Sequence, residues 1–475
     1  MTPYMTTWFS TMSAERTARS AIFSAILFFC SCSSGAANAP LLVQAHYTSP
    51  LQGISAARFE DVLRGKITSF AKLGGPDSPI TLYCDRAIYK KFKAAYPGAP
   101  MRETDTAADS VVARDRSALI ISDIRGVAPH LKLLPVDGQY PWGALGKDYA
   151  IDPPGGYPLR LPGAASWDPV KHISVVQTGV TAMTRAFIPA VDRRGDLLYP
   201  VRHTMDISSR ADIAVTSNEV SFLDPCTYPL RDNLSFCSPT RFFRVLTASG
   251  FDVIELTGNH NNDFGRRHSL RTLEMIRKAG MSYFGGGENS DDAERIRFVK
   301  AKGYTVAFVG FNEIGPPAAW ATKNGPGAAR LTMALLEEKV KEAAAKADVV
   351  FVSIQCGNEN SPVPWKDQRR YLRRAVEMGA TVTVSSSAHR AMGLEFYRGR
   401  FISYGLGNFL FDQMHTINHR RGMIARHHFY EGRHIQTELI PYLIHDHCRP
   451  VPVHGHEARG LLDYVFQHSL GEVFR

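Results

Sequence analysis

The sequence lacks most of the short motifs that reveal a chemistry directly. It has no phosphate-binding loop of the Gly-x-x-x-x-Gly-Lys-Ser/Thr type, no Gly-x-Ser-x-Gly elbow and no Cys-x-x-Cys pair. ATP-driven ligation, serine-nucleophile hydrolysis and a structural zinc site are therefore not favoured. The apolar run over residues 21–29 is far shorter than the ~20 residues of a membrane-spanning helix, and no other stretch is long and apolar enough to span a bilayer.

The charge imbalance is too small to indicate a nucleic-acid-binding protein. Lys and Arg number 55 and Asp and Glu 45, which gives a net charge of +10 spread over 475 residues. Such an excess is compatible with an anionic substrate or surface, although a soluble protein that happens to be basic explains it more simply. The composition, 44% hydrophobic and 21% charged, is that of an ordinary globular protein, and the length suggests two or three domains.

The first 39 residues have the organisation of a secretory signal peptide. Two arginines precede the apolar run 21–29, and small residues follow over 33–39. A charged region, a short apolar region and a small-residue end predict export to the periplasm or the cell envelope. Cys32, which is followed by Ser-Ser-Gly, leaves a lipid anchor as an alternative, although the residues before it match a lipoprotein signal poorly.

Export would favour disulfide bonds over free thiols. Cys226 and Cys237 lie close together in a segment rich in Pro, Asp and Asn, so a disulfide between them is the default expectation in an oxidising compartment. Cys356 and Cys448 remain as a second pair whose proximity the sequence does not determine.

Two α/β domains joined by a linker are expected. Over residues 40–135, short apolar runs alternate with helical patterns, which indicates a small α/β domain. Its expected elements are helices over 56–63 and 87–95 and strands over 80–83 and 118–121. Residues 136–169 are rich in Pro and Gly, which is typical of a linker.

The second domain, residues 170–475, repeats one pattern of apolar runs that end in polar turns and alternate with helices. This alternation indicates a larger α/β domain. The expected strands cover 173–176, 213–215, 253–256, 305–309, 349–354 and 382–384, and the expected helices cover 269–279, 333–345 and 368–378. Because side chains beyond the carboxyl ends of such strands meet in one crevice, we expect the polar turns to form a site.

The first domain resembles part of a known ligand-binding fold. Segments 53–59, 63–68 and 73–80 are similar, in their spacing, to a periplasmic solute-binding protein of the phosphate-binding type. A full binding protein has two lobes, and residues 40–135 are too short to form both. We therefore expect a structural or docking role in preference to ligand capture.

The second domain carries a more specific resemblance. Residues 256–265 (LTGNHNNDFG) are similar to the N-N-H-x-x-D-x-G motif of the CapA family, proteins of poly-γ-glutamate capsule synthesis with a metallophosphatase-like fold. Segments 211–219, 355–368 and 388–412 resemble, in order, the N-x-E, H-W-G-x-E and G-x-H-P-H to S-L-G-N-F motifs of that family. The resemblance implies a metallophosphatase-like α/β sandwich over residues 170–475, preceded by the smaller α/β solute-binding-like domain.

The metal-ligand positions of this family are only partly kept. Where the family has Asp, Asn, His and His, this chain has, respectively, Val180, Gly258, Gln355 and Ser387. Valine cannot bind a metal, and Gln and Ser are poor ligands for transition metals. A two-metal phosphoesterase centre is therefore not expected. The resemblance leaves one divalent ion (Zn, Mn or Fe) with the ligands His260, His389 and Glu219.

The same motifs imply the other functional residues. The candidates for catalysis are Glu219, Asn259, His260 and Glu359. The two glutamates would act as general base or acid. The candidates for substrate binding are Asn408, Arg420 and Arg421, because a basic cluster that follows a site motif attracts a polyanion.

A purely structural interpretation of some of these residues stays open. His260 and Asn259 are also what a buried polar network at a strand end would contain, with Asp263 capping the next helix. Asn408 lies in a Gly-Leu-Gly-Asn turn, where it would also serve turn geometry alone.

Three functions compete at this point. The first is an exported protein of poly-γ-glutamate or related anionic capsule-polymer synthesis or export, which binds the polymer and works with the envelope synthesis machinery. The second is a single-metal phosphoesterase or amide hydrolase, in which the ion activates water. The third is a polymer-binding module that keeps the fold without the chemistry. None of the three involves nucleic acid.

Overall fold

The computed structural model describes residues 38–104, 115–144, 159–162, 165, 167–226, 234–358 and 361–474. Residues 1–37 of the predicted signal segment, which include Cys32, and the candidate residue Glu359 lie outside these ranges. Within the ranges, no helix combines the length and the apolar composition that crossing a membrane requires.

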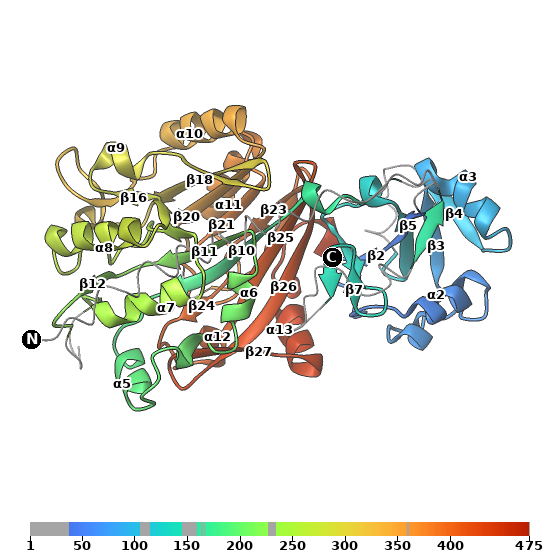
Figure 1. The fold of residues 1–475 in the computed structure, drawn as a ribbon, viewed down its shortest axis with the longest axis horizontal. Helices are drawn as coiled ribbons and strands as arrows, with labels where there is room; N and C mark the ends of the chain where they lie inside the picture. The colour runs from blue at the N-terminus through green and yellow to red at the C-terminus, as the bar shows by residue number, and fades with distance from the viewer. Residues whose placement is uncertain are drawn as a thin grey trace, which may run out of the picture.

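Two β-sheets form the centre of the chain from residue 172 onward (Figure 1). The strands of the larger sheet are β10 (His172–Thr181), β11 (Ile213–Asn218), β14 (Val253–Glu255), β15 (Ser282–Phe284), β24 (Asn408–Leu410), β25 (Arg421–Tyr430), β26 (Arg433–His445) and β27 (Arg449–Pro452). Those of the smaller sheet are β17 (Arg297–Ala301), β18 (Tyr304–Asn312), β20 (Val349–Gln355), β21 (Val382–Ser385), β22 (Leu394–Tyr397) and β23 (Arg400–Ser403). Parallel pairs join β10, β11, β14 and β15 in the larger sheet and β18, β20, β21 and β23 in the smaller one.

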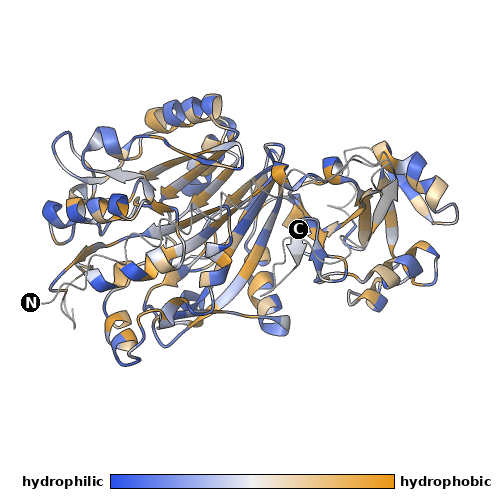
Figure 2. Cartoon of the chain, in the orientation of Figure 1, coloured by the Kyte–Doolittle hydropathy of each residue, from blue (hydrophilic) through white to orange (hydrophobic). Residues whose placement is uncertain are grey.

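The two sheets pack against each other and carry helices on their outer faces. One buried cluster contains Val215 and Phe284 from the larger sheet together with Phe308 and Phe351 from the smaller one. The helices that cover the larger sheet include α5 (Phe187–Asp192), α7 (Phe243–Ala248) and α8 (Arg266–Lys278), and those that cover the smaller sheet are α10 (Met333–Lys346) and α11 (Lys366–Glu377). Figure 2 shows hydrophobic colour along the strands and hydrophilic stripes on α8 and α10. The predicted α/β sandwich is confirmed, with the layers in the order α/β/β/α.

The central parallel strands are largely apolar because both faces of each sheet are covered there. All seven residues of β20 (VVFVSIQ) are buried, as expected for a parallel strand between two layers. The helices begin at polar caps; for example, the Thr332 hydroxyl accepts from the N–H of Leu335 at the start of α10. These local signals explain why the expected strands and helices of this region are present, with boundaries shifted by a few residues.

The first domain is a smaller α/β unit with one sheet in the order β4-β3-β5-β2-β6. Its elements are β2 (Leu42–His46), α2 (Ala56–Leu63), β3 (Thr81–Asp85), α3 (Arg86–Ala95), β4 (Met101–Thr104), β5 (Ala118–Ser122) and β6 (Leu131–Leu134). Phe59, Phe70 and Phe92 are fully buried in its core. The helices predicted over 56–63 and 87–95 correspond to α2 and α3.

The long antiparallel hairpin of β25 and β26 connects this domain to the two-sheet body. Tyr430 and Ile435 of the hairpin belong to the core of the first domain. The N–H of Leu133 donates to Gln436 Oε1 at 3.1 Å, and Tyr47 Oη donates to the carbonyl of Thr437 at 3.1 Å. Figure 1 shows the first domain, in blue to cyan, beside the end of this hairpin. The contact supports the docking role inferred for the first domain.

Candidate functional site

Polar residues at the carboxyl ends of both sheets meet in one hydrogen-bonded network. Gln355, at the end of β20, donates through Nε2 to Glu219 Oε1 at 3.0 Å and to Asn259 Oδ1 at 2.9 Å. Asn312, at the end of β18, donates through Nδ2 to Gln355 Oε1 and to the carbonyl of Thr257, both at 2.7 Å. The convergence expected from the alternating pattern is therefore present, and it brings Glu219, Asn259 and Gln355 together.

The inner layer of this network is closed to solvent. Glu219 is 1% exposed, Gln355 2% and Glu255 1%. Burial raises the pKa of Glu255 above its usual range, although hydrogen bonds from Thr257 and Ser386 act in the opposite direction. Gln355 thus spans the two sheets as a crosslink, with both ends of its amide used, where the family pattern has a histidine.

His260 and Asp263 form a hydrogen-bonded pair at the outer edge of the network. His260 Nδ1 lies 2.7 Å from Asp263 Oδ2, and His260 Nε2 lies 3.3 Å from Asn259 Nδ2. Burial opposes protonation of His260, but the hydrogen bond to Asp263 and the charge of Glu219 together raise its pKa above the ordinary value. This geometry is that of an acid–base dyad, in which the carboxylate orients the imidazole and stabilises its charged form.

Asp263 does not act as a helix cap. Gly265 occupies the N-cap position of α8, with no capping side-chain hydrogen bond. Asp263 instead accepts from the backbone N–H of Phe236 at 2.7 Å through Oδ2, the same oxygen that contacts His260. The capping interpretation is therefore wrong, and the carboxylate serves the dyad.

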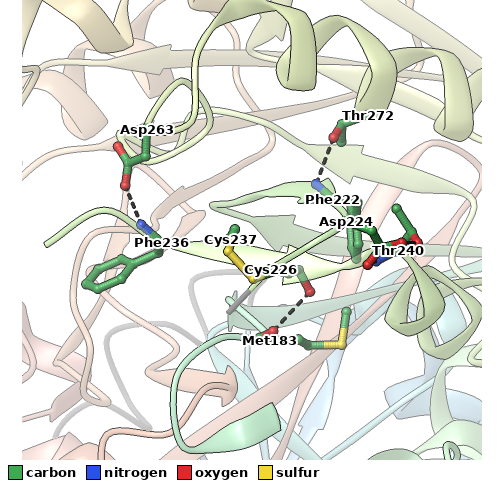
Figure 3. The surroundings of a disulfide bond; sticks show 10 residues. Met183, Phe222, Asp224, Cys226, Phe236, Cys237, Thr240, Asp263 and Thr272 are labelled. Atoms are coloured by element: carbon green, nitrogen blue, oxygen red, sulfur yellow. Dashed lines mark hydrogen bonds between the residues drawn. A yellow bond between two sulfur atoms is a disulfide. The ribbon is translucent and has the colours of Figure 1, made fainter. Parts of the chain in front are cut away.

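The predicted disulfide between Cys226 and Cys237 is present, and Figure 3 shows it next to Phe236, which is hydrogen-bonded to Asp263. Cys237 begins β13 (Cys237–Pro239), which pairs in parallel with β12 (Ser221–Leu223). The preceding residue is Phe236, whose N–H bonds Asp263 and whose ring centroid lies 4.4 Å from that of His260. The disulfide thus holds the segment that positions both members of the dyad.

The other cysteines do not form a second bridge. Cys356 and Cys448 are free and buried, in the separate cores that lie outside the smaller and the larger sheet. Each core fills its own layer of the sandwich, so the two thiols are not brought together.

Arg185 is a functional candidate that the sequence patterns do not reveal. It lies in the turn after β10, with φ of 52°, in the left-handed region. Its guanidinium carbon lies 4.7 Å from the ring centroid of Phe236 and 4.9 Å from that of Phe411, and Nε donates to Asp412 Oδ1 at 3.0 Å. Its charge acts against protonation of His260, which places it beside the dyad. The sequence indicates Arg185 as a candidate only through its position just after β10.

Asn408 and Arg420 form hydrogen bonds within their own turn and to the neighbouring strand. Asn408 is fully buried, its Oδ1 lies 2.8 Å from His389 Nδ1, and its Nδ2 donates to the carbonyls of His389 and His419. Arg420 donates through Nε to the carbonyl of Ile444 at 3.1 Å. The side chain of Asn408 therefore links two backbone segments of the surrounding turn through hydrogen bonds.

Arg420 and Arg421 do not join the dyad. They lie where α12 (Ile417–Arg420) meets β25, and no contact links either of them to His260 in the part of the chain that the structure describes. Their role in substrate binding stays a prediction.

The side chains in place do not fit a metal ion. Among the described residues, no three His, Cys, Asp or Glu side chains are grouped so that they could hold one, so the predicted set of Glu219, His260 and His389 is not assembled. His260 contacts the ring of Phe236, whereas His389 contacts the ring of Phe411. The hydrogen bond from Gln355 also occupies Glu219 Oε1, one of the oxygens that an ion would need.

The residues that depart from the family pattern fit the packing around them. A Cβ atom at Gly258 would lie 2.6 Å from Glu219 Cα, so an asparagine does not fit there unless the strand end moves. Beside Val180, a cavity of about 10 Å³ is lined by Gln177 and Ser217. Gln177 Oε1 and Ser217 Oγ are buried without a hydrogen-bond partner among the described residues, and such neutral oxygens suit a water molecule better than a transition metal.

A comparison with known families gives the class of this two-sheet α/β sandwich. The family model described as "Bacterial capsule synthesis protein PGA_cap" matches residues 174–413. The chain belongs to this family. That range covers every site motif except the basic pair Arg420 and Arg421.

Two curated relatives carry related names. The chain is 27% identical over 297 residues to "Capsule biosynthesis protein CapA" of Bacillus anthracis, which covers 60% of this chain and 72% of that protein. It is 31% identical over 211 residues to "PGA biosynthesis protein CapA" of Bacillus subtilis, over 44% of this chain and 55% of that protein. Among solved structures, a 5'-nucleotidase precursor from Thermus thermophilus matches with a TM-score of 0.37 and 14% identity, over 62% of this chain and 58% of that one.

Proposed function

We propose that this protein is an exported accessory protein of capsule-polymer synthesis that binds an anionic polymer, of the poly-γ-glutamate class, at the edge formed by His260, Asp263 and Arg185. The names of the two curated relatives support the polymer class. The observation that carries the proposal is the polarity of this edge, where the guanidinium of Arg185 and the imidazole of His260 are partly exposed while the nearby carboxylates other than that of Asp263 are buried.

The exposed fractions of the side chains make this polarity explicit. The side chains of Arg185 and His260 are 25% and 19% exposed, respectively. The carboxylates of Glu219, Glu255 and Asp412 belong to residues that are 1%, 1% and 8% exposed. The Asp263 side chain is 17% exposed and is paired with His260, so the Arg185 guanidinium is the most exposed of these charged groups, which favours a negatively charged ligand.

The dyad supports a second candidate, acid–base chemistry on the same polymer. An imidazole oriented by a carboxylate and with a raised pKa suits a general acid that protonates a leaving amine. Glu219 is too deeply buried to exchange a proton with a polymer directly. Since the donor set does not fit an ion, we assign no step to a metal.

Export and envelope localisation are part of the proposal. The disulfide between Cys226 and Cys237 is typical of an oxidising compartment. An exported polymer-binding protein would work beside the envelope machinery that makes or moves the polymer. Cys32 is the residue at which a lipid anchor would attach.

The test is equilibrium binding of purified poly-γ-glutamate to the mature, oxidised protein, with polymer length followed in the same samples. We expect saturable binding that weakens with added salt and that is reduced in His260→Ala. Shortening of the polymer by the wild type, but not by Asp263→Asn, would favour the acid–base candidate. Absence of binding at low ionic strength would overturn the proposal.

A further inference from the structure

We propose that Arg185 is the residue that recognises the polymer, by holding one carboxylate of a repeat unit through the free edge of its guanidinium. This inference rests on the proposed function and adds the chemical group that is recognised and the residue that recognises it. Two observations support it: the contacts that hold the Arg185 side chain in place, and the guanidinium N–H groups that those contacts leave without a partner among the described residues.

Two of the three guanidinium nitrogens hold the side chain in place. Nε and Nη2 both donate to Asp412 Oδ1, while Asp412 Oδ2 accepts from the N–H of Ala186. Nη1 makes no hydrogen bond to any residue that the structure describes, and the second hydrogen of Nη2 points along the same edge. The edge formed by Nη1 and Nη2 is therefore available for a pair of parallel hydrogen bonds, the arrangement in which guanidinium and carboxylate match.

The aromatic rings and the backbone hold the Arg185 side chain in place before a ligand binds, so binding costs less conformational entropy than it does for a mobile arginine. Phe236 and Phe411, which are 6% and 1% exposed, lie against the guanidinium. Cation–π contacts of this kind are strongest where water is excluded. The backbone of Arg185 itself is in the left-handed region, which is costly for a residue with a side chain and is retained where the surroundings enforce it. A pre-positioned donor binds with a smaller loss of entropy.

The local charges favour a carboxylate over a phosphate. Arg185 is balanced by Asp412, and His260 by Asp263, while Glu219 adds a further negative charge nearby. These carboxylates repel a group with two negative charges more strongly than a group with one, and the planar pair of oxygens of a carboxylate matches the two donors of the open edge.

Calorimetric titration with γ-linked oligoglutamate would test the assignment in the full-length mature protein. Arg185→Gln removes the charge and the paired donors, and Arg185→Lys keeps the charge but removes the planar edge. We expect Kd to rise about 10- to 100-fold for Arg185→Gln and about tenfold for Arg185→Lys, since charge-assisted hydrogen bonds carry that range.

Arg297 provides the matched control. It also stacks on an aromatic ring, that of Tyr283, and it pairs with a carboxylate, Asp292, while its side chain is 20% exposed. Arg297→Gln is expected to change Kd by less than about twofold, because it lies outside the proposed site. Thermal melting of every variant separates lost binding from lost folding, and Arg185→Lys covers the case in which Arg185→Gln fails to fold.

The outcomes are distinct. If the wild type binds oligoglutamate and the Arg185 variants bind equally well, the recognition role is refuted while the proposed function stands. If the wild type does not bind, the proposed function itself fails. Tighter binding of polyphosphate than of oligoglutamate, lost in Arg185→Lys, would keep the site but overturn the preference for carboxylate.

Discussion

Breaking the disulfide is expected to weaken both the fold and the site. Cys226 and Cys237 are 11 residues apart, and the chain-entropy relation for a loop of that length gives about 3 kcal/mol of stabilisation. Without this link, the strand that begins at Cys237 loses its covalent tether. Phe236, the residue directly before it, then no longer holds Asp263 through its N–H or His260 through its ring.

The assay compares the wild type with a variant in which both cysteines are replaced by alanine. Urea unfolding measures the free energy of unfolding, and poly-γ-glutamate binding measures the site in the same preparations. Treatment of the wild type with a reductant is a second route to the same state, because the remaining described cysteines are free. We expect a loss of about 3 kcal/mol and weaker polymer binding in both cases.

Cys448→Ala controls for the loss of a buried sulfur. Cys448 is fully buried but belongs to the core outside the larger sheet and does not contact the dyad. It is expected to lower stability through the cavity that it leaves while polymer affinity stays close to that of the wild type. If reduced and oxidised proteins unfold at the same urea concentration and bind polymer equally, the reasoning from the disulfide to the dyad is wrong.

Two further predictions concern the hairpin and the inner network. Burial lowers the pKa of His46 to about 4 and that of His434 to about 3. Both values lie below the ordinary 6.5, so the unfolded chain takes up these protons at a higher pH than the folded protein does. The free energy of unfolding is therefore highest above about pH 6.5 and decreases as the pH falls toward 4. Urea midpoints should therefore decline over this window, and less steeply in His434→Phe; a pH-independent midpoint would contradict this. Gln355→Ala should cost about 1–3 kcal/mol for each buried partner that it leaves unpaired, whereas Gln413→Ala, which removes a half-buried bond to Asn408, should cost less. Equal midpoints for the two variants would refute the crosslink.

The hairpin of β25 and β26 contributes to the core of the first domain. That core includes Tyr430 and Ile435, which the second domain supplies. The preference for a structural role over ligand capture stays a prediction. The hairpin escaped prediction because β25 and β26 contain histidines and arginines at buried positions, such as Arg426 paired with Glu438, which obscure a strand pattern.

The sequence also anticipated which site residues would depart from the family pattern, but not what they do. Gln355 was expected only as a poor metal ligand, and in the structure its side chain forms hydrogen bonds that link the two sheets. Asn408 stays a candidate for substrate binding, and the structure adds that it is fully buried and hydrogen-bonds the surrounding turn. Residue identity limits the chemistry available at a position, whereas burial and partners determine which part of that chemistry is used.

Local patterns were sufficient for the elements, the fold class, the Cys226–Cys237 disulfide and the family, because periodicity, turn residues and motif spacing act over short stretches of chain. The assembly of the site was decided only by the tertiary structure. Arg185, His260 and Phe411 come from turns far apart in sequence, and their proximity depends on the order of β10, β14 and β24 in the larger sheet. The burial of Glu219 and the partial exposure of Arg185 and His260 were likewise decided by the tertiary structure, since burial is a property of the folded chain and not of any segment in it.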